Sequence, residues 1–297
     1  MIGERMQYFP APAKLNLFLH LVGRRPDGYH LLQTCYQFVD LCDQVGLRVR
    51  GDGRIERFAG ADGVLPQADL AVRAARALQQ ASGCRLGADI SVLKRIPMGA
   101  GLGGGSSDAA TTLAALNRLW ELGLGPQDLA DLGLGLGADV PVFVHGRAAW
   151  AEGVGERLTP LYPPQAPAET MYLILKPNVS ISTAAVFQDP DLTRNSPTIT
   201  INGFLAHGGR NDCEAVVRRR YPQVAGAIDY LSRFGGARLT GTGACVFIDC
   251  KTSERGREMM QRMPPAFAAF LVRGLNDSPL LERLACGGAS EAPSAEN

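Results

Sequence analysis

The segment of the sequence that best predicts chemistry is a glycine-rich run between a strand pattern and a helix pattern. Glycine has no Cβ atom, so its backbone can approach an anion closely. The free N–H groups at the start of the following helix favour the same anion, and two serines add hydroxyl groups for a phosphate or a metal ion. We therefore predict a phosphate-binding loop, made of Pro97, Met98, Gly99, Ala100, Gly101, Leu102, Gly103, Gly104, Gly105, Ser106 and Ser107.

Two other kinds of glycine loop fit this segment less well. A Walker loop ends in Gly-Lys-Ser/Thr, and no lysine follows these glycines. The dinucleotide-binding pattern GxGxxG does match at Gly99, Gly101 and Gly104, with Glu121 near the distance expected for a ribose-binding acid. That acid should end a second strand, however, whereas Glu121 ends the predicted helix. A nicotinamide-dependent oxidoreductase stays open as a second function class, which stabilisation by NAD(P) instead of ATP–magnesium would identify.

Two further segments carry polar side chains where a site could form. Residues 13–21 alternate, with four leucines on one face and Lys14 and Asn16 on the other, which predicts a half-buried strand. Asp139 lies in Gly-Ala-Asp-Val-Pro and directly precedes an apolar run, 140–144, that we expect to form a strand. Taken singly, Lys14 could be a surface charge and Asp139 a turn or cap residue.

The apolar periodicity predicts the elements that would position these residues. In the first half it predicts strands at 32–41, 44–50 and 89–96, helices at 70–82 and 109–120, and a loop at 51–63. In the second half it predicts helices at 211–220 and 224–233 and strands at 171–175 and 238–249, the latter containing a glycine turn, Leu-Thr-Gly-Thr-Gly-Ala. Four prolines in 159–170 indicate a boundary, so we expect domains at 1–160 and 161–286 and a disordered tail at 287–297.

The composition argues against several function classes. The chain has 30 basic and 29 acidic residues and a sequence pI near 7.6, so it lacks the basic excess of a nucleic-acid binder. Its seven cysteines form no Cys-x-x-Cys pair, which argues against a structural zinc site. Because the sequence shows neither a signal-peptide pattern nor an apolar run of about 18 residues, we expect a cytoplasmic protein without a membrane span. No oligomeric state is predicted.

In combination, the motifs resemble those of the GHMP small-molecule kinase superfamily. The shared features are Pro-Ala-Lys-Leu-Asn-Leu near the N-terminus, the loop Pro-x-x-x-Gly-Leu-Gly-Gly-Gly-Ser-Ser, and the late Leu-Thr-Gly-Thr-Gly-Ala-Cys-Val-Phe. Within the superfamily, Asp-Gly-Tyr-His at 27–30, Gly-Ala-Asp-Val-Pro at 137–141 and Asn-Asp-Cys-Glu at 211–214 are similar to the members that act on a cytidine diphosphate-linked methylerythritol. The similarity extends from about Pro12 to Leu284.

The resemblance implies an α+β fold of two domains, with ATP and substrate in the cleft between them. The N-terminal domain would resemble the ribosomal protein S5 domain 2-like fold, and the C-terminal domain a ferredoxin-like fold. The implied activity is ATP-dependent phosphorylation of the 2-hydroxyl of 4-diphosphocytidyl-2-C-methyl-D-erythritol, in the non-mevalonate route to isoprenoid precursors. A GHMP kinase for another alcohol and a catalytically silent ATP-binding regulator are the alternatives on the same fold.

The resemblance also implies roles for individual residues. Asp139 would accept the proton of the substrate hydroxyl, and Lys14 would stabilise the charge that builds in the transition state. The glycine loop would hold the ATP phosphates, with Mg²⁺ near Ser106 or Ser107. At the cytidine end, the aromatic rings of Tyr29 and Phe187 would cover the two faces of the cytosine. His30 would supply hydrogen bonds to the base, and Asn16 and Thr183 would make polar contacts with the substrate.

Asp108 does not fit simple electrostatics, because it places a carboxylate in the first helical turn beside the expected phosphates. An acid at this position suits the helix dipole, but it would repel a nucleotide if it pointed inward. We therefore expect Asp108 to face away from the phosphates or to reach Mg²⁺ through water.

Overall fold

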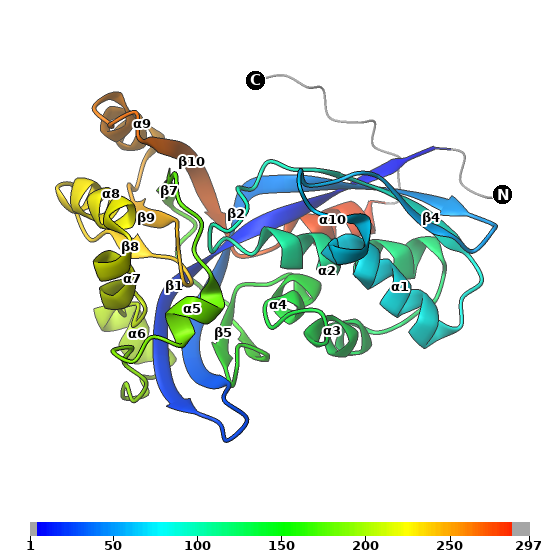
Figure 1. Ribbon diagram of the computed structural model, residues 1–297, viewed down its shortest axis with the longest axis horizontal. Coiled ribbons are helices and arrows are strands. Elements are labelled where there is room, and N and C mark those ends of the chain that lie inside the picture. Colours follow the sequence, from blue (N-terminus) through cyan, green and yellow to red (C-terminus); the bar gives the residue numbers. More distant parts are fainter. Residues whose placement is uncertain (1–4, 287–297) are drawn as a thin grey trace.

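The computed structural model describes residues 5–286, and Figure 1 shows how their helices and strands are arranged. The expected disordered tail, 287–297, lies outside these residues. The strands are β1 (Gln7–Arg24), β2 (His30–Arg50), β3 (Ile55–Ala59), β4 (Gly87–Leu93), β5 (Ala149–Glu152), β6 (Arg157–Pro160), β7 (Met171–Pro177), β8 (Arg238–Leu239), β9 (Val246–Asp249) and β10 (Phe267–Leu275). The α-helices are α1 (Leu70–Ser82), α2 (Gly104–Leu119), α3 (Pro126–Leu134), α4 (Val140–His145), α5 (Thr183–Phe187), α6 (Ile201–His207), α7 (Glu214–Arg220), α8 (Pro222–Ser232), α9 (Ser253–Gln261) and α10 (Pro279–Ala285), and a 3-10 turn, η1, spans Pro66–Ala68.

A single sheet connects the two halves of the described chain. Its strands follow the order β3-β4-β2-β10-β7-β9-β8. Outside this order, β1 pairs with β2, and β5 pairs with both β2 and β6. The link is β10, which pairs with β7 along most of its length and with β2 where Gly274 and Leu275 lie opposite Val39 and Phe38. The described pairings are antiparallel except that of β3 with β4. The alternation at 13–21 thus correctly predicted a strand, β1, but the strand is buried on both faces and not half-buried, since Lys14 and Asn16 are also buried.

The strand boundaries differ from the sequence-based prediction in two places. The expected strands at 32–41 and 44–50 are one continuous strand, β2, and the expected loop at 51–63 contains the edge strand β3. Asp43 lies between the two predicted strands, and its carboxylate is buried and accepts hydrogen bonds from the backbone N–H groups of Arg95, at 2.6 Å, and Ile96, at 2.8 Å. A satisfied acid can therefore lie inside a strand.

Helices cover one face of the first part of the sheet. The predicted helices at 70–82 and 109–120 are confirmed as α1 and α2, which pack beneath β4, β2 and β1 in Figure 1. The last helix, α10, returns to this same core, where Leu280 is buried. A second core lies between the sheet and helices α7 and α8. The domain division at residue 160 stays a prediction. No helix in residues 5–286 is long and apolar enough to span a membrane.

The apolar run at 140–144 is a helix and not the strand that we predicted. Val140–His145 forms α4, with Pro141 in its first turn, where the missing N–H costs no hydrogen bond. The residues Val140, Val142 and Phe143 are all buried against α2 and α3. In a short run of apolar residues only, the spacing of polar and apolar positions cannot distinguish a strand from a helix. This explains why a strand was predicted here.

Candidate active site

The glycine-rich loop is fixed between β1 and the turn that follows β8. Lys14 donates its backbone N–H to the carbonyl oxygen of Leu102 at 3.0 Å. On the other side, Gly101 adopts a φ of +75°, and a Cβ atom there would lie only 2.4 Å from the carbonyl oxygen of Thr240. Glycine is therefore required at this position for both conformation and space. The loop borders a cavity of about 580 Å³.

The N-terminus of α2 faces this cavity. Gly103, with a φ of +74°, precedes the first helical residue, Gly104. The first N–H groups of a helix have no partner within it and carry partial positive charge, so they favour a phosphate. Ser106 lines the cavity beside them. Ser107 does not: its side chain is fully buried and its N–H donates to Gly103 O at 2.9 Å, so its contact with ATP stays a prediction.

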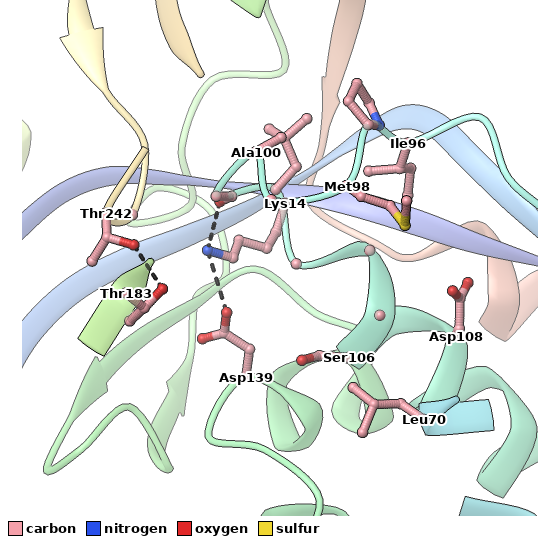
Figure 2. A pocket seen from close by; sticks show the side chains of 18 of the residues that line it. Lys14, Leu70, Ile96, Met98, Ala100, Ser106, Asp108, Asp139, Thr183 and Thr242 are labelled. Carbon is pink, nitrogen blue, oxygen red and sulfur yellow. Dashed lines mark hydrogen bonds and ion pairs between the residues drawn. The ribbon is translucent and has the colours of Figure 1, made fainter. Parts of the chain in front are cut away.

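Lys14 and Asp139 meet beside the glycine loop, and Figure 2 shows their side chains facing each other. The ammonium of Lys14 lies 3.4 Å from a carboxylate oxygen of Asp139 and donates to Gly101 O at 3.0 Å and to Asn16 Oδ1 at 2.6 Å. The amide nitrogen of Asn16 in turn donates to Thr34. Because the Lys14 side chain is only 4% exposed, these partners hold its charge in one place.

Asp139 is held from a second direction by Tyr36. Asp139 immediately precedes α4, and its side chain is 31% exposed toward the cavity that it lines. The hydroxyl of Tyr36 donates to the other carboxylate oxygen at 2.9 Å. Burial, together with the nearby charge of Asp139, raises the pKa of Tyr36 well above its usual range, so the hydroxyl keeps its proton. The carboxylate therefore has a fixed orientation between an ammonium and a hydroxyl donor.

The other end of the cavity has an apolar wall and one anchored lysine. Lys94 forms ion pairs with Asp43 and, at 2.7 Å, with Asp108. Figure 2 shows Asp108 on the opposite side of the α2 N-terminus from Asp139; it also lines the cavity, so its orientation relative to a bound phosphate stays a prediction. The apolar residues that line this end are Ala61, Val64, Ala68, Leu70, Val92 and Met98.

The residues expected to bind the cytidine end are only partly brought together. Thr183 and Phe187 line the cavity, and the Thr183 hydroxyl lies 2.9 Å from that of Thr242. His30 is buried and stacks on Phe187, with ring centroids 4.9 Å apart. Tyr29 is 63% exposed and does not line the cavity. In this structure His30, and not Tyr29, therefore covers one face of Phe187.

Comparison with known proteins identifies the family. Residues 69–147 match the family model described as GHMP kinases N terminal domain, and residues 190–269 match GHMP kinases C terminal. The 4-diphosphocytidyl-2-C-methyl-D-erythritol kinase of Alkalilimnicola ehrlichii is 55% identical over 278 residues, which are 94% of each chain. The chain belongs to the 4-diphosphocytidyl-2-C-methyl-D-erythritol kinase family. It is therefore an ATP-dependent small-molecule kinase, and the oxidoreductase alternative is not supported.

Solved structures agree with membership of this kinase family. A crystal structure of 4-(cytidine 5'-diphospho)-2C-methyl-D-erythritol kinase superposes with a TM-score of 0.77 at 32% identity, covering 90% of this chain and 98% of the other. The mevalonate kinase of Methanococcus jannaschii has a TM-score of 0.69 at 17% identity, covering 92% and 99% of the two chains. The second match shows the fold alone. Together they confirm the predicted α+β fold of the GHMP kinases.

Two residues of this kinase site were missed by the sequence analysis. Tyr36 lies in a largely buried strand, where an aromatic residue is usually part of the core, so nothing in its local pattern marked the hydroxyl. Lys94 carried a weak signal, because the chain has only four lysines. Its acidic partners, Asp43 and Asp108, lie far from each other in the sequence, and only the fold brings them together.

Replacing Gly101 with alanine is expected to raise the KM for ATP about tenfold or more and to lower the Tm. The new Cβ would contact two backbone carbonyl oxygens, at 2.4 and 2.9 Å, and neither can move without shifting the second glycine turn. Gly123→Ala is the matched control, because Gly123 has a φ of +67° with open space around it. Steady-state kinetics and thermal unfolding of both variants measure the effect. Equal effects would show that the positive φ alone is responsible.

Asp108 is expected to make stability depend on pH. Burial raises the pKa of Asp108 to about 7, Lys94 acts against this rise, and Asp43 adds to it. An acid whose pKa is higher in the folded state binds a proton on folding, so stability decreases as pH rises from about 4 to 7. Urea unfolding at pH 5, 6.5 and 8 should show that the wild type loses stability relative to Asp108→Asn, by at most about 1.4 kcal/mol per pH unit. Parallel pH curves would contradict this assignment.

Proposed function

We propose that this kinase transfers the γ-phosphoryl group of ATP to the 2-hydroxyl of 4-diphosphocytidyl-2-C-methyl-D-erythritol. The observation that carries the proposal is the meeting of Lys14 and Asp139 beside the N-terminus of α2, in one cavity with the glycine loop. A carboxylate, an ammonium and a phosphate-binding helix end are the groups that phosphoryl transfer to an alcohol requires. The choice of alcohol rests on the relatives, which are named for that substrate.

The proposed mechanism assigns each group a position along the cavity. The apolar end, with Leu70 and Met98, would hold the adenine, and the free N–H groups of α2 would hold the phosphates. Asp139 would accept the proton from the substrate hydroxyl as its oxygen attacks the γ-phosphorus, and ADP would leave. Lys14 would lie beside both charges and stabilise the negative charge on the transferring group. The balance is one alcohol and ATP giving a phosphate ester, ADP and a proton.

We further propose that Mg²⁺ binds together with the nucleotide. No group of three or more His, Cys, Asp or Glu residues between residues 5 and 286 could hold a metal ion alone. The donor set nonetheless fits, because protein-bound Mg²⁺ commonly uses one or two protein oxygens, substrate phosphates and water. The hydroxyl of Ser106, which lines the cavity, would supply a protein oxygen. The ion would neutralise phosphate charge during transfer.

An ATP-consumption assay over a panel of alcohols tests the proposed function. The panel contains the cytidine-linked methylerythritol, mevalonate, homoserine and galactose, each with the wild-type enzyme. We expect a kcat/KM at least about a hundredfold higher for the cytidine-linked compound, because a nucleotide end offers many more contacts than a small alcohol. A preference for another alcohol would support a different GHMP kinase, and no turnover with any alcohol would support the silent regulator.

A cytoplasmic location and the absence of a nucleic-acid partner stay predictions from the sequence. Roles in substrate binding also stay predictions for Asn16, Tyr29, His30, Thr183 and Phe187. Their common test is the KM of the cytidine-linked substrate, because a change confined to the cytidine end should alter this constant while leaving the KM for ATP unchanged.

A further inference from the structure

Arg194 is tied to the wall of the cavity by an unusually complete set of hydrogen bonds. Its guanidinium donates to the backbone oxygens of Leu192 at 3.0 Å, Phe187 at 2.9 Å and Asp189 at 2.7 Å. A fourth donor, Nε–H, points at His30 Nε2 at 3.0 Å. A planar guanidinium with several fixed partners has little freedom, so the direction of this last donor is also fixed.

This contact determines the protonation state of His30. An arginine is always charged in proteins and has no acceptor, so the Nε2 atom facing it must present a lone pair. His30 is therefore neutral, with its proton on Nδ1. Among residues 5–286, none is hydrogen-bonded to Nδ1, which leaves an N–H donor available to a ligand. The ring itself is held flat against Phe187, at an interplanar angle of 18°.

We propose that Arg194 is a positioning residue for substrate binding, which presents His30 to the pyrimidine as a neutral ring with its donor at Nδ1. The inference rests on the proposed function, because it assumes that the His30–Phe187 wall contacts the cytidine end. Cytosine offers two acceptors on its Watson–Crick edge, O2 and N3, which a fixed N–H donor can recognise. Arg194 does not line the cavity that holds Lys14 and Asp139, so it should act on binding and not on the chemical step.

The charges around His30 give the proposal a pH signature. Burial lowers the pKa of His30, and the charges of Arg194 and then Arg24 lower it further. The neutral ring therefore persists to lower pH than an ordinary histidine, whose pKa is about 6.5. Without Arg194, the pKa should rise toward that value and both tautomers should become accessible. Because protonation leaves the Nδ1–H donor in place, it should restore substrate binding in that variant as pH falls, whereas in the wild type it would remove the acceptor that faces Arg194 and so weaken binding.

The experiment measures KM and kcat for the cytidine-linked substrate from pH 5.5 to 8 in the wild type and in Arg194→Met. We expect the KM at pH 8 to rise about threefold to tenfold, the size of a lost hydrogen bond. The kcat and the KM for ATP should stay within about twofold. In the wild type the KM should rise as His30 becomes protonated at low pH, whereas in Arg194→Met it should fall toward the wild-type value, and His30→Asn, which cannot titrate, should abolish both trends.

Arg219→Met is the matched control for loosening of the same loop. Arg219 forms ion pairs with Asp189 at 2.9 Å and with Asp191 at 2.8 Å, and within residues 5–286 it makes no hydrogen bond to His30. An unchanged KM profile in Arg194→Met, or the same change in Arg219→Met, would overturn the proposal. Calorimetric binding of cytidine 5'-diphosphate to each variant provides a second readout. A lower affinity of Arg194→Met for cytidine 5'-diphosphate would support the inference even if the wild type does not phosphorylate the cytidine-linked alcohol. That lack of turnover would contradict only the proposed function.

Discussion

Asp139→Asn is expected to lower kcat by about 10²–10⁴-fold, the range that general-base catalysis contributes. The substitution keeps the size of the side chain, and an amide oxygen can still accept the hydrogen bond from Tyr36, which is 2.9 Å long in the wild type. An amide cannot take up the proton of the substrate hydroxyl, so the chemical step should lose its base while the site keeps its shape. Steady-state kinetics with saturating ATP and substrate measure the change.

Two further measurements separate the chemical role of Asp139 from a structural one. Stabilisation by ATP–magnesium in a thermal shift assay should persist in Asp139→Asn, because the glycine loop is unaltered. Asp131→Asn serves as the matched control, since Asp131 lies in the neighbouring helix α3 and bonds to Gln127 at 2.8 Å without lining this cavity. Near-normal turnover in Asp139→Asn would remove Asp139 from the role of base.

The local sequence was sufficient to predict the glycine-rich loop, because the shape of that loop depends on the backbone conformation of its own residues. The glycines at 99, 101 and 103 require positive φ values, and those requirements are visible in the residue types themselves. The strand–loop–helix order around them followed from periodicity. The pairing of Lys14 with Asp139 did not follow from spacing, because 125 positions separate them. The family resemblance supplied it, and in the structure Tyr36, which lies opposite Asn16 in the β1–β2 register, holds the Asp139 carboxylate.

Side-chain contacts between distant segments could not be predicted in the same way. Tyr36 in β2 bonds to Asp139 at the start of α4, across about a hundred residues of sequence, and the helix itself was mistaken for a strand. Likewise, the stacking of His30 on Phe187 was not predicted, because the resemblance implied only that Tyr29 and Phe187 cover the two faces of the cytosine. In each case the residue types fit more than one partner, and long-range packing determined which contact forms.

Lys14→Met is expected to lower kcat by about 10²–10³-fold, the cost of removing one preorganised donor from the transition state. It should also destabilise the fold by about 1–3 kcal/mol, because a buried acceptor that loses its donor bears its full desolvation cost. Two such acceptors, Asn16 Oδ1 at 2.6 Å and Gly101 O at 3.0 Å, lie against the ammonium. Kinetics and urea unfolding measure the two effects on the same preparation.

The two effects of Lys14 can be separated with a control and a double variant. Lys176→Met removes a lysine that does not line the cavity. Within residues 5–286 its ammonium donates hydrogen bonds to the backbone oxygens of Pro177, at 2.8 Å, and Val179, at 3.2 Å, and to no other atom, so the substitution should lower stability without lowering kcat. Because Lys14 and Asp139 act on one transferring group, Lys14→Met/Asp139→Asn should lose much less activity than the product of the single losses. Fully multiplicative losses would show that the two residues act independently, although their side chains lie 3.4 Å apart.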